Sequence, residues 1–226
     1  DRNSQTTNAV VLYFNLCPDS LRSRVMANLQ ADLESRDYAL TAGDIGYSFL
    51  LKALSENGMS ETIFRMNNRY DVPGYGWQLA HGATALTESW QAYGSVSNNH
   101  FMLGHLMEWL FGGVAGLSQT AESVGFKTLK IDPQMVGSLT HASATRQTPY
   151  GEARCSWRRD ENSIELNVTV PTNSRAEVWL PTEDITTVRE HGRPLSHKAV
   201  NKSRPGKLCV CVGSGEYHFE IKEKQN

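Results

Sequence analysis

Hydrophobic and polar residues alternate with two different periods along the 226 residues of the chain. In the first half the apolar positions recur every three or four residues, and the stripe Leu21, Val25, Leu29 and Leu33 shows this spacing most clearly. That spacing is typical of a helix with one buried face. The first half of the chain is therefore predicted to be helical.

Residues at the ends of these stretches predict where helices begin and stop. Pro18 and Asp19 suit the first turn of the helix that carries the stripe, because proline loses no needed donor there and the carboxylate meets the positive end of the helix dipole. Tyr70–Gly76, with one proline and two glycines, is predicted to be a loop. A further helix is predicted from Asp44 to Asn57, with Gly58 as its stop. Ala9–Leu16 is predicted to close an earlier helix, and other helices are predicted to begin at Ser60, near Ala83 and near Asn99. The apolar run Phe101–Leu117 is predicted to be the last helix.

After about residue 120 the period becomes two, which is typical of strands with one buried face. Asp160–Asn162 between two such runs predicts a hairpin turn, and Gly213–Gly215 predicts another turn. Repeated hairpins favour an antiparallel β-sandwich. The alternating apolar residues are Ala153, Cys155 and Trp157, then Ile164, Leu166, Val168 and Val170, then Ala176, Val178 and Leu180, then Leu208, Val210 and Val212, and last Tyr217, Phe219 and Ile221.

Composition narrows the classes of function. Apolar residues make up 39% and charged residues 20%, as in soluble globular proteins, and the formal net charge is −2. No surplus of positive charge favours nucleic-acid binding, and no apolar run is long enough to predict a membrane span. The four cysteines and seven histidines show no metal-ligand spacing, so neither a metal site nor another cofactor is expected. The compartment stays open.

Candidate chemistry lies between Tyr70 and His105. Aromatic residues that suit the faces of sugars are concentrated there, namely Tyr75, Trp77, Trp90 and Tyr93. Glu88 is predicted to lie in the first turns of a helix and to be buried beside the indole of Trp90, and His100 is predicted to begin the apolar helix.

Ordinary structural interpretations compete with these functional ones. A glutamate near a helix start usually interacts with the helix dipole, and tryptophans in a helical domain more often belong to the core. His100 by default is a capping or core histidine. The residue types alone leave these alternatives open.

A series of short motifs lies in a fixed order along the chain, namely Thr41–Gly46, Pro73–Trp77, Gly82–Trp90, Ser97–His100 and Val114–Leu117. Their order and spacing together resemble the α-L-rhamnosidases of glycoside hydrolase family 78. Thr148–Gly151 with the Trp157 strand resembles the C-terminal β-sandwich domain of the same family, so the resemblance covers nearly the whole chain.

The resemblance implies an α + β multidomain fold. Residues 1–118 would form the second half of an (α/α)6 barrel of the six-hairpin glycosidase type, and residues 119–226 an antiparallel β-sandwich. The chain would then be the C-terminal part of a longer enzyme. Its expected partners are a rhamnoside and the missing N-terminal part of the same enzyme, with no nucleic acid and no membrane.

The resemblance also implies roles for individual residues. Glu88 matches the general base of an inverting hydrolase that releases terminal α-L-rhamnose, and His100, Trp90, Trp77 and Tyr75 match residues of the sugar pocket. In such enzymes the base activates a water molecule, and a second carboxyl group roughly 6.5–9.5 Å away protonates the leaving oxygen. No segment before Glu88 resembles the loop that carries that acid in the family, so the isolated chain is expected to be inactive.

Two carboxylates and several departures from the family pattern bear on these roles, among them Gly46-Tyr47 in place of a common Gly-Thr. Asp44 and Asp71 are the nearby alternatives for the acid. Thr87 and Tyr75 each stand where the family usually has Trp, which leaves the sugar accepted open. The alternatives are a six-hairpin glycosidase of different specificity and a non-catalytic carbohydrate-binding or structural module.

Overall fold

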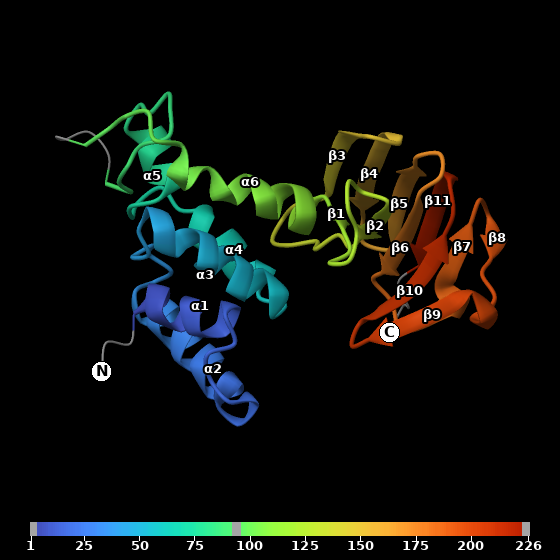
Figure 1. Cartoon of the computed structure of the whole chain (residues 1–226), viewed down its shortest axis with the longest axis horizontal. Coiled ribbons are helices and arrows are strands. Elements are labelled where there is room, and N and C mark those ends of the chain that lie inside the picture. Colours follow the sequence, from blue (N-terminus) through green and yellow to red (C-terminus); the bar gives the residue numbers. More distant parts are fainter. Residues whose placement is uncertain (1–3, 92–95, 223–226) are drawn as a thin grey trace. The chain divides into compact units, whose positions relative to one another are not determined.

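The computed structural model describes residues 4–91 and 96–222. The chain divides into two compact units, residues 1–109 and residues 110–226. The helices of the first unit are blue to green in Figure 1, and the strands of the second run from yellow-green to red. This order of a helical part and a β part confirms the predicted α + β multidomain fold.

Most of the predicted helices are present. The helix predicted from Asp44 to Asn57 ends at Glu56. Two other helices begin where they were expected, one at Asp19, directly after Pro18, and one at Ser60. The helical elements of the first unit are α1 (Gln5–Tyr13), α2 (Asp19–Ser35), α3 (Asp44–Glu56), α4 (Ser60–Asn67), α5 (Tyr75–Ala80), the 3₁₀-helix η1 (Phe101–His105) and α6 (Leu106–Trp109).

The prediction of a helix near Ala83 is wrong, because residues 81–91 form turns and irregular backbone. Gly82 ends α5 with a φ of +82°, a conformation that favours glycine. The amide of Ala83 then donates back to the carbonyl of Gln78 at 2.9 Å. The following residues bond to side chains and to the distant backbone of Ser97 and His100 instead of forming a helical ladder.

The apolar run Phe101–Leu117 is not one regular helix. Its helical character changes from η1 through α6 to the π-helical stretch η2 (Leu110–Val114), and Leu117 already belongs to a strand. The last helical carbonyls are taken up within the second unit, where Gly113 accepts from the amide of Gln134 and Val114 accepts from the indole of Trp157. Those bonds satisfy the end of the run without a further turn.

A few buried polar side chains join the helices of the first unit. Gln5 of α1 is fully buried, and its side chain accepts from the amides of Thr41 and Ala42 and donates to the carbonyl of Ala39. Tyr47 of α3 is also fully buried, and its hydroxyl donates to Asn67 of α4 at 2.8 Å. Such buried bonds hold irregular backbone in one place because breaking them leaves unpaired polar groups.

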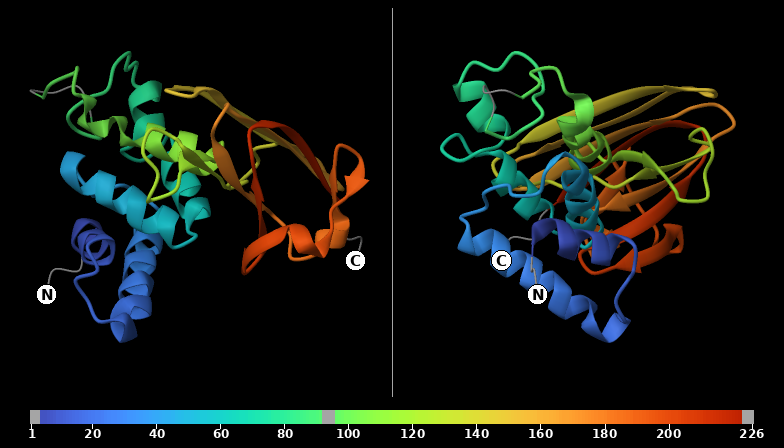
Figure 2. Two further views of the ribbon diagram at one scale, coloured as in Figure 1. Left: turned by 45° about the vertical axis from the view of Figure 1, so that its right-hand side comes forward. Right: turned by 60° about the vertical axis from the view of Figure 1, so that its left-hand side comes forward.

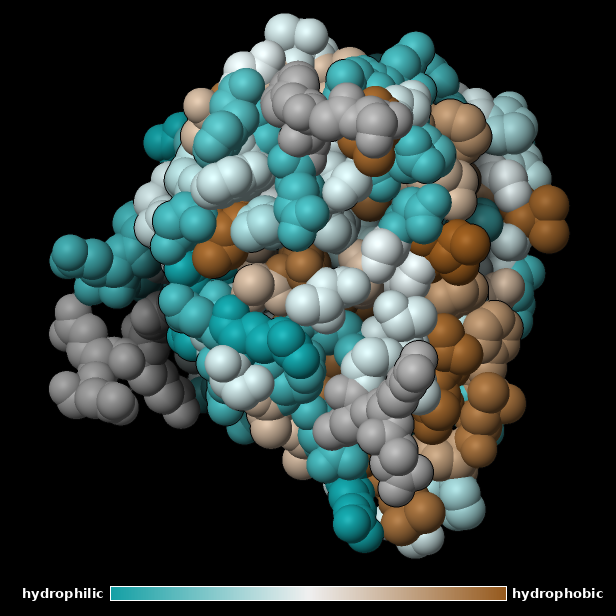
Figure 3. Space-filling view, turned by 90° about the vertical axis from the view of Figure 1, so that its left-hand side faces the viewer, coloured by the Kyte–Doolittle hydropathy of each residue, from teal (hydrophilic) through white to brown (hydrophobic). Residues whose placement is uncertain are grey.

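The apolar surface of the helical unit is only partly covered. In α2, Leu29 and Leu33 are fully buried but Leu21 is 44% exposed, so the predicted stripe is covered only at its C-terminal end. Figure 3 shows apolar residues, in brown, gathered along one side of the face that it draws. The exposed large apolar side chains of this unit are Phe14, Leu16, Leu21, Ile45, Tyr70, Leu79, Phe101 and Met107. No helix among the described residues is both long enough and apolar enough to span a membrane.

The second unit is built from two sheets (Figure 2). A five-stranded sheet has the order β1-β2-β6-β10-β9, and a six-stranded sheet has the order β3-β4-β5-β11-β7-β8. The strands are β1 (Leu117–Gln119), β2 (Thr128–Ile131), β3 (His141–Thr148), β4 (Gly151–Arg159), β5 (Ser163–Val170), β6 (Arg175–Leu180), β7 (Val188–Glu190), β8 (Arg193–Pro194), β9 (Val200–Arg204), β10 (Lys207–Val212) and β11 (Gly215–Lys222). Short 3₁₀-helices lie at Ile185–Thr187 and His197–Ala199.

The predicted strand faces are largely confirmed. Alternating residues of β4 and β5 are buried on one side, and the turn between them is closed by the amide of Asp160 donating to the carbonyl of Ser163. Among the strands that the structure describes, β2 and β6 pair in parallel, and the other pairings are antiparallel. The turn Gly213–Gly215 does not form a hairpin, because β10 and β11 pair in different sheets.

A buried carboxylate ties β2 to β9 and β10. The side chain of Asp132, directly after β2, is 4% exposed and accepts from Arg204 at 2.6 Å and from Lys207 at 2.7 Å, while the ammonium group of Lys130 lies 3.3 Å away. Burial alone raises the pKa of Asp132, but these cations together hold that pKa below its ordinary value. Asp132 is therefore ionised in the folded state and is the counter-charge that Lys130, Arg204 and Lys207 share.

Asp132→Asn is expected to destabilise the second unit by about 2 kcal/mol, because it removes the counter-charge of the partly buried Lys207 and the charged hydrogen bonds to Lys207 and Arg204. Unfolding in urea, followed by the tryptophan fluorescence of the 226-residue chain, measures the change. A carboxyl group with a lowered pKa stabilises the fold above its unfolded pKa of about 4, and this stabilisation is lost as the pH falls through the lower folded value. The difference between wild type and variant should shrink accordingly below about pH 4.

Glu161→Gln is the matched control, since Glu161 is exposed in the turn between β4 and β5. It is expected to change the free energy of unfolding by less than about 0.5 kcal/mol. Equal stability of Asp132→Asn and wild type at neutral pH would contradict the structural role of the carboxylate.

Candidate functional site

In the short irregular segment Thr87–Trp90, the charged residue Glu88 is exposed although Thr87 and Trp90 are buried. Thr87 is 1% exposed and Trp90 is 6% exposed, whereas the side chain of Glu88 is exposed. The expectation that Glu88 lies in a helix and is buried beside an indole is therefore wrong. The carboxylate of Glu88 is instead exposed, on a segment whose flanking residues Thr87 and Trp90 are packed in the interior.

The first anchor of this segment is Gln78, a glutamine of α5 that is only 3% exposed. Its side-chain amide donates to the hydroxyl of Thr87 at 2.8 Å and to the carbonyl of Ser89 at 3.1 Å. The hydroxyl of Thr87 also donates to the carbonyl of Ser89, at 2.7 Å. The residues on both sides of Glu88 are thus joined to one buried side chain.

The second anchor is Trp90. Its indole N–H donates to the carbonyl of Ala42 at 2.7 Å, and Ala42 is in turn fixed by Gln5 of α1. The ring meets those of Tyr47 and Tyr75 edge to face, with centroids 4.8 and 5.1 Å apart. The structure therefore places Trp90 beneath the segment as part of its support, and the idea that it also contacts a sugar stays a prediction.

Backbone hydrogen bonds bring Glu88 and His100 onto adjacent segments. The amide of Glu88 donates to the carbonyl of Ser97, and the amide of His100 donates to the carbonyl of Leu86. The carboxylate of Glu88 accepts from the amide of Ser97 at 3.0 Å. The ring of His100 is half-buried, with its Nε2 4.0 Å from the carboxylate of Asp44 at the start of α3. The two predicted polar site residues are therefore neighbours in space as well as in the motif order.

A cavity of about 330 Å³ opens beside this segment, lined by α5 and by the chain that leads to Glu88. Tyr75 contributes to its wall, and the hydroxyl of Tyr75 donates to the carbonyl of Leu103. Burial raises the pKa of Tyr75, so it stays a neutral donor. Glu88 itself follows the last lining residue, Leu86, by two positions. The full lining is Tyr75, Gln78, Leu79, Ala83, Thr84, Ala85 and Leu86.

The remaining candidates lie apart from this arrangement or outside the described residues. Trp77 is half-buried on α5 and stacks on the ring of His81 with centroids 3.9 Å apart. Tyr93 lies outside the described residues. Asp71 forms a two-pronged ion pair with Arg69, which lowers its pKa to about 2, so Asp71 holds no proton to donate near neutral pH.

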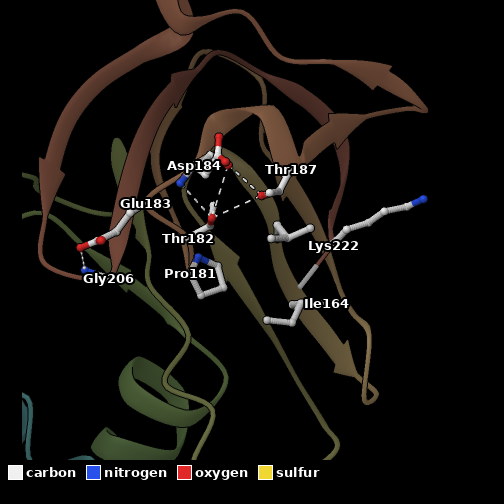
Figure 4. A pocket seen from close by; sticks show the side chains of 9 residues that line it. Ile164, Pro181, Thr182, Glu183, Asp184, Thr187, Gly206 and Lys222 are labelled. Atoms are coloured by element: carbon white, nitrogen blue, oxygen red, sulfur yellow. Dashed lines mark hydrogen bonds between the residues drawn. The ribbon is translucent and has the colours of Figure 1, made fainter. Parts of the chain in front are cut away.

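A second cavity, of about 580 Å³, lies in the β unit near the loop after β6. Figure 4 shows that the polar groups of this loop face one another, with the hydroxyl of Thr187 donating to the carbonyl of Asp184 and that of Thr182 within hydrogen-bond distance of the same loop. The carboxylate of Glu183 accepts from the amide of Gly206. These groups serve the loop itself. Within residues 4–91 and 96–222, no group of three or more His, Cys, Asp or Glu side chains could hold a metal ion.

The sequence reasoning missed Gln78 as part of this site. The available signal was an amide side chain in the otherwise apolar or aromatic stretch Tyr75–Ala80, where a buried polar residue requires partners. The role of Thr87 was also missed, although its departure from the family pattern had singled it out.

Comparisons with known protein families cover most of the chain. Residues 1–114 match the model described as the bacterial alpha-L-rhamnosidase six-hairpin glycosidase domain. Residues 116–193 match the model described as the bacterial alpha-L-rhamnosidase C-terminal domain. Each half of the structure thus has a counterpart in the same group of enzymes, in the same order.

Individual relatives agree with these matches. A curated alpha-L-rhamnosidase of Streptomyces avermitilis is 27% identical over 97% of this chain and 22% of its own length. The solved alpha-L-rhamnosidase of Dictyoglumus thermophilum superposes with a TM-score of 0.90 at 29% identity, covering 97% of this chain and 25% of that one. The S. avermitilis enzyme solved with L-rhamnose superposes with a TM-score of 0.89 at 27% identity, covering 97% of this chain and 22% of its own. The chain spans about a quarter of the length of the relatives it matches.

Trp90→Phe is expected to lower the free energy of unfolding of the helical unit by about 2 kcal/mol, because it leaves the buried carbonyl of Ala42 unpaired and removes part of a packed ring. Urea unfolding followed by the helical circular dichroism signal measures this loss. Trp77→Phe is the control, since Trp77 is half-buried, and it should cost less than about 1 kcal/mol. Equal losses in the two variants would contradict the anchoring role of Trp90.

Proposed function

The chain belongs to the family of bacterial α-L-rhamnosidases with a six-hairpin glycosidase domain, and from this premise we propose that it contributes the general base to an inverting hydrolase of terminal α-L-rhamnosides. Glu88 is the base in this proposal. The general acid belongs to residues outside this chain. L-Rhamnose is the sugar bound in one solved relative, which supports rhamnose as the sugar released.

The observation that carries the proposal is the exposed carboxylate of Glu88 on a segment fixed from inside by Gln78 and Trp90. A general base must lie within hydrogen-bond reach of its water and must keep that place during the reaction. A side chain fixed on both flanks, next to a cavity and to His100, meets the second requirement. An exposed helix glutamate in an ordinary dipole interaction needs no such support.

The proposed chemistry uses one water molecule. Glu88 takes a proton from this water as the oxygen attacks the anomeric carbon from the face opposite the leaving group. The acid, at roughly 6.5–9.5 Å, protonates the departing oxygen, and the product has the inverted configuration. His100, with Asp44 close to its Nε2, is placed to donate a hydrogen bond to a sugar hydroxyl.

The source of the acid follows from the carboxylates near Glu88. Asp71 is ionised by its pairing with Arg69, and Asp44 lies at the start of α3 beside His100. Asp71 therefore has no proton to donate as an acid, and the carboxylate of Asp44 lies 4.0 Å from Nε2 of His100, the ring assigned here to a sugar hydroxyl. The exposed apolar side chains of the helical unit support a larger assembly in which other helices cover them and supply the opposite wall of the pocket.

One observation favours a second candidate function, namely binding of carbohydrate without hydrolysis. Of the two candidate acids, Asp71 is ionised by its pairing with Arg69 and Asp44 lies beside His100, and no segment before Glu88 resembles the acid-bearing loop of the family. Titration of the isolated chain with L-rhamnose, followed by tryptophan fluorescence, tests this alternative. Saturable binding that is unchanged in Glu88→Gln and His100→Ala would favour the non-catalytic function.

Glu88→Gln in the full-length enzyme is expected to lower kcat for an aryl α-L-rhamnoside by roughly 10²- to 10⁴-fold, because the amide cannot accept the proton of the water. The control is Glu56→Gln, which removes an exposed carboxylate at the end of α3 and should leave kcat unchanged. Wild-type turnover by Glu88→Gln would refute the proposed role. So would NMR detection of the α-anomer as the first product.

The isolated 226-residue chain is expected to show no hydrolysis of the same aryl rhamnoside, since the acid is absent from it. Release of the coloured aglycone measures turnover, and the rate of the full-length enzyme in the same assay is the reference. Turnover by the isolated chain that Glu88→Gln abolishes would place the acid within this chain and overturn that part of the proposal.

A further inference from the structure

We propose that Gln78 is a positioning residue for the general base, acting on Glu88 through Thr87 and Ser89. The inference rests on the proposed function of Glu88. Gln78 does not touch Glu88, and it does not match any motif residue that carried the family resemblance. Its role follows from where its hydrogen bonds lead.

Gln78 is itself held in a fixed place. The helix α5 lies so close to the preceding chain that a Cβ on Gly76 would overlap the carbonyl group of Arg69. Gln78 follows Gly76 by two positions on the same helix, and it is buried, at 3% exposure. An amide on a short helix that cannot shift toward its neighbour is a rigid reference point for the chain that follows.

Gln78 makes two hydrogen bonds to the turn after α5 and two to the segment that carries the base. Its backbone carbonyl accepts from the amides of His81 and Ala83, which shapes the turn after α5. Its side-chain nitrogen donates both protons, one to Thr87 and one to Ser89. One residue therefore determines how the chain leaves α5 and how it lies on both sides of Glu88.

The geometry singles out the peptide groups that flank Glu88. The bonds from Gln78 and from Thr87 converge on the carbonyl of Ser89, and Gln78 also donates to Thr87, so the three groups form a closed triangle that joins both neighbours of Glu88. Buried networks of this kind are rigid when complete and costly when one member is missing. Loss of the amide would free the Thr87–Ser89 backbone to move, and a shift of about 1 Å at a catalytic group can cost on the order of 10²-fold in rate.

The test uses Gln78→Met in the full-length enzyme, with kcat and KM measured on an aryl α-L-rhamnoside. The expected result is a fall in kcat of about 10- to 100-fold with KM within about 3-fold of wild type, because the sugar contacts stay and the base is misplaced. Gln91→Met is the matched control, since Gln91 is exposed three residues after Glu88, and it should keep the wild-type kcat.

A second pair of variants separates positioning from folding. Gln78→Met combined with Thr87→Val leaves no unpaired side-chain polar group at either position, although the carbonyl of Ser89 loses both of its donors. We expect this double variant to be folded, to be no less stable than Gln78→Met alone, and to keep the kcat defect of Gln78→Met. Wild-type kcat in the folded double variant would overturn the inference.

The Glu88→Gln background provides the remaining readout. If Gln78 acts only through Glu88, adding Gln78→Met to Glu88→Gln leaves the residual rate unchanged. An equal further loss in that background, or a rise in KM at constant kcat, would show a role independent of the base and overturn the inference. Wild-type turnover by Glu88→Gln alone would instead refute the proposed function, so the two failures are distinguishable.

Discussion

The candidate site depends on one physical constraint, namely that irregular backbone keeps a fixed path in a protein interior only where its polar groups find partners. Residues 81–91 form no helix or strand, yet Thr87 and Trp90 are buried. The amide of Gln78 satisfies the carbonyl of Ser89, the amide of Glu88 donates to the carbonyl of Ser97, and the indole of Trp90 ties the segment to the carbonyl of Ala42. Glu88 can therefore face outward from a loop and still have a rigid base beneath it.

These anchors connect the site to most of the helical unit. The carbonyl that receives the indole of Trp90 belongs to Ala42, which Gln5 of α1 fixes, and the ring of Trp90 rests against Tyr47 of α3, whose hydroxyl reaches α4. Helices far from the carboxylate thus contribute to its position. The family matches assign the helical unit to a glycosidase domain and the β unit to the C-terminal domain of the same enzymes. They are the reason for interpreting the anchored carboxylate as part of a sugar-hydrolysing site.

Much of the fold could be predicted from sequence, since it depends on local periodicity. The alternation in β4 and β5 predicted their buried faces, and the caps around α3 predicted its ends to within a residue. The helix predicted around Ala83 was wrong because the bond from Gln78 to Thr87 spans nine positions and follows no helical or strand period. The pairing of β10 and β11 in different sheets was missed for a similar reason, since a Gly-Ser-Gly turn allows either a hairpin or a crossover. The roles of Glu88 and His100 came from resemblance, and the domain boundary after residue 118 stays a prediction.

The central claim is that Glu88 activates the water that attacks the sugar. A structure of the full-length enzyme with L-rhamnose bound measures this most directly, through the position of the Glu88 carboxylate relative to the anomeric carbon. The account predicts a carboxylate oxygen about 3 Å from a water molecule on the face of the ring opposite the leaving group. Rhamnose bound beyond reach of such a water, with Glu88 facing bulk solvent, would contradict it.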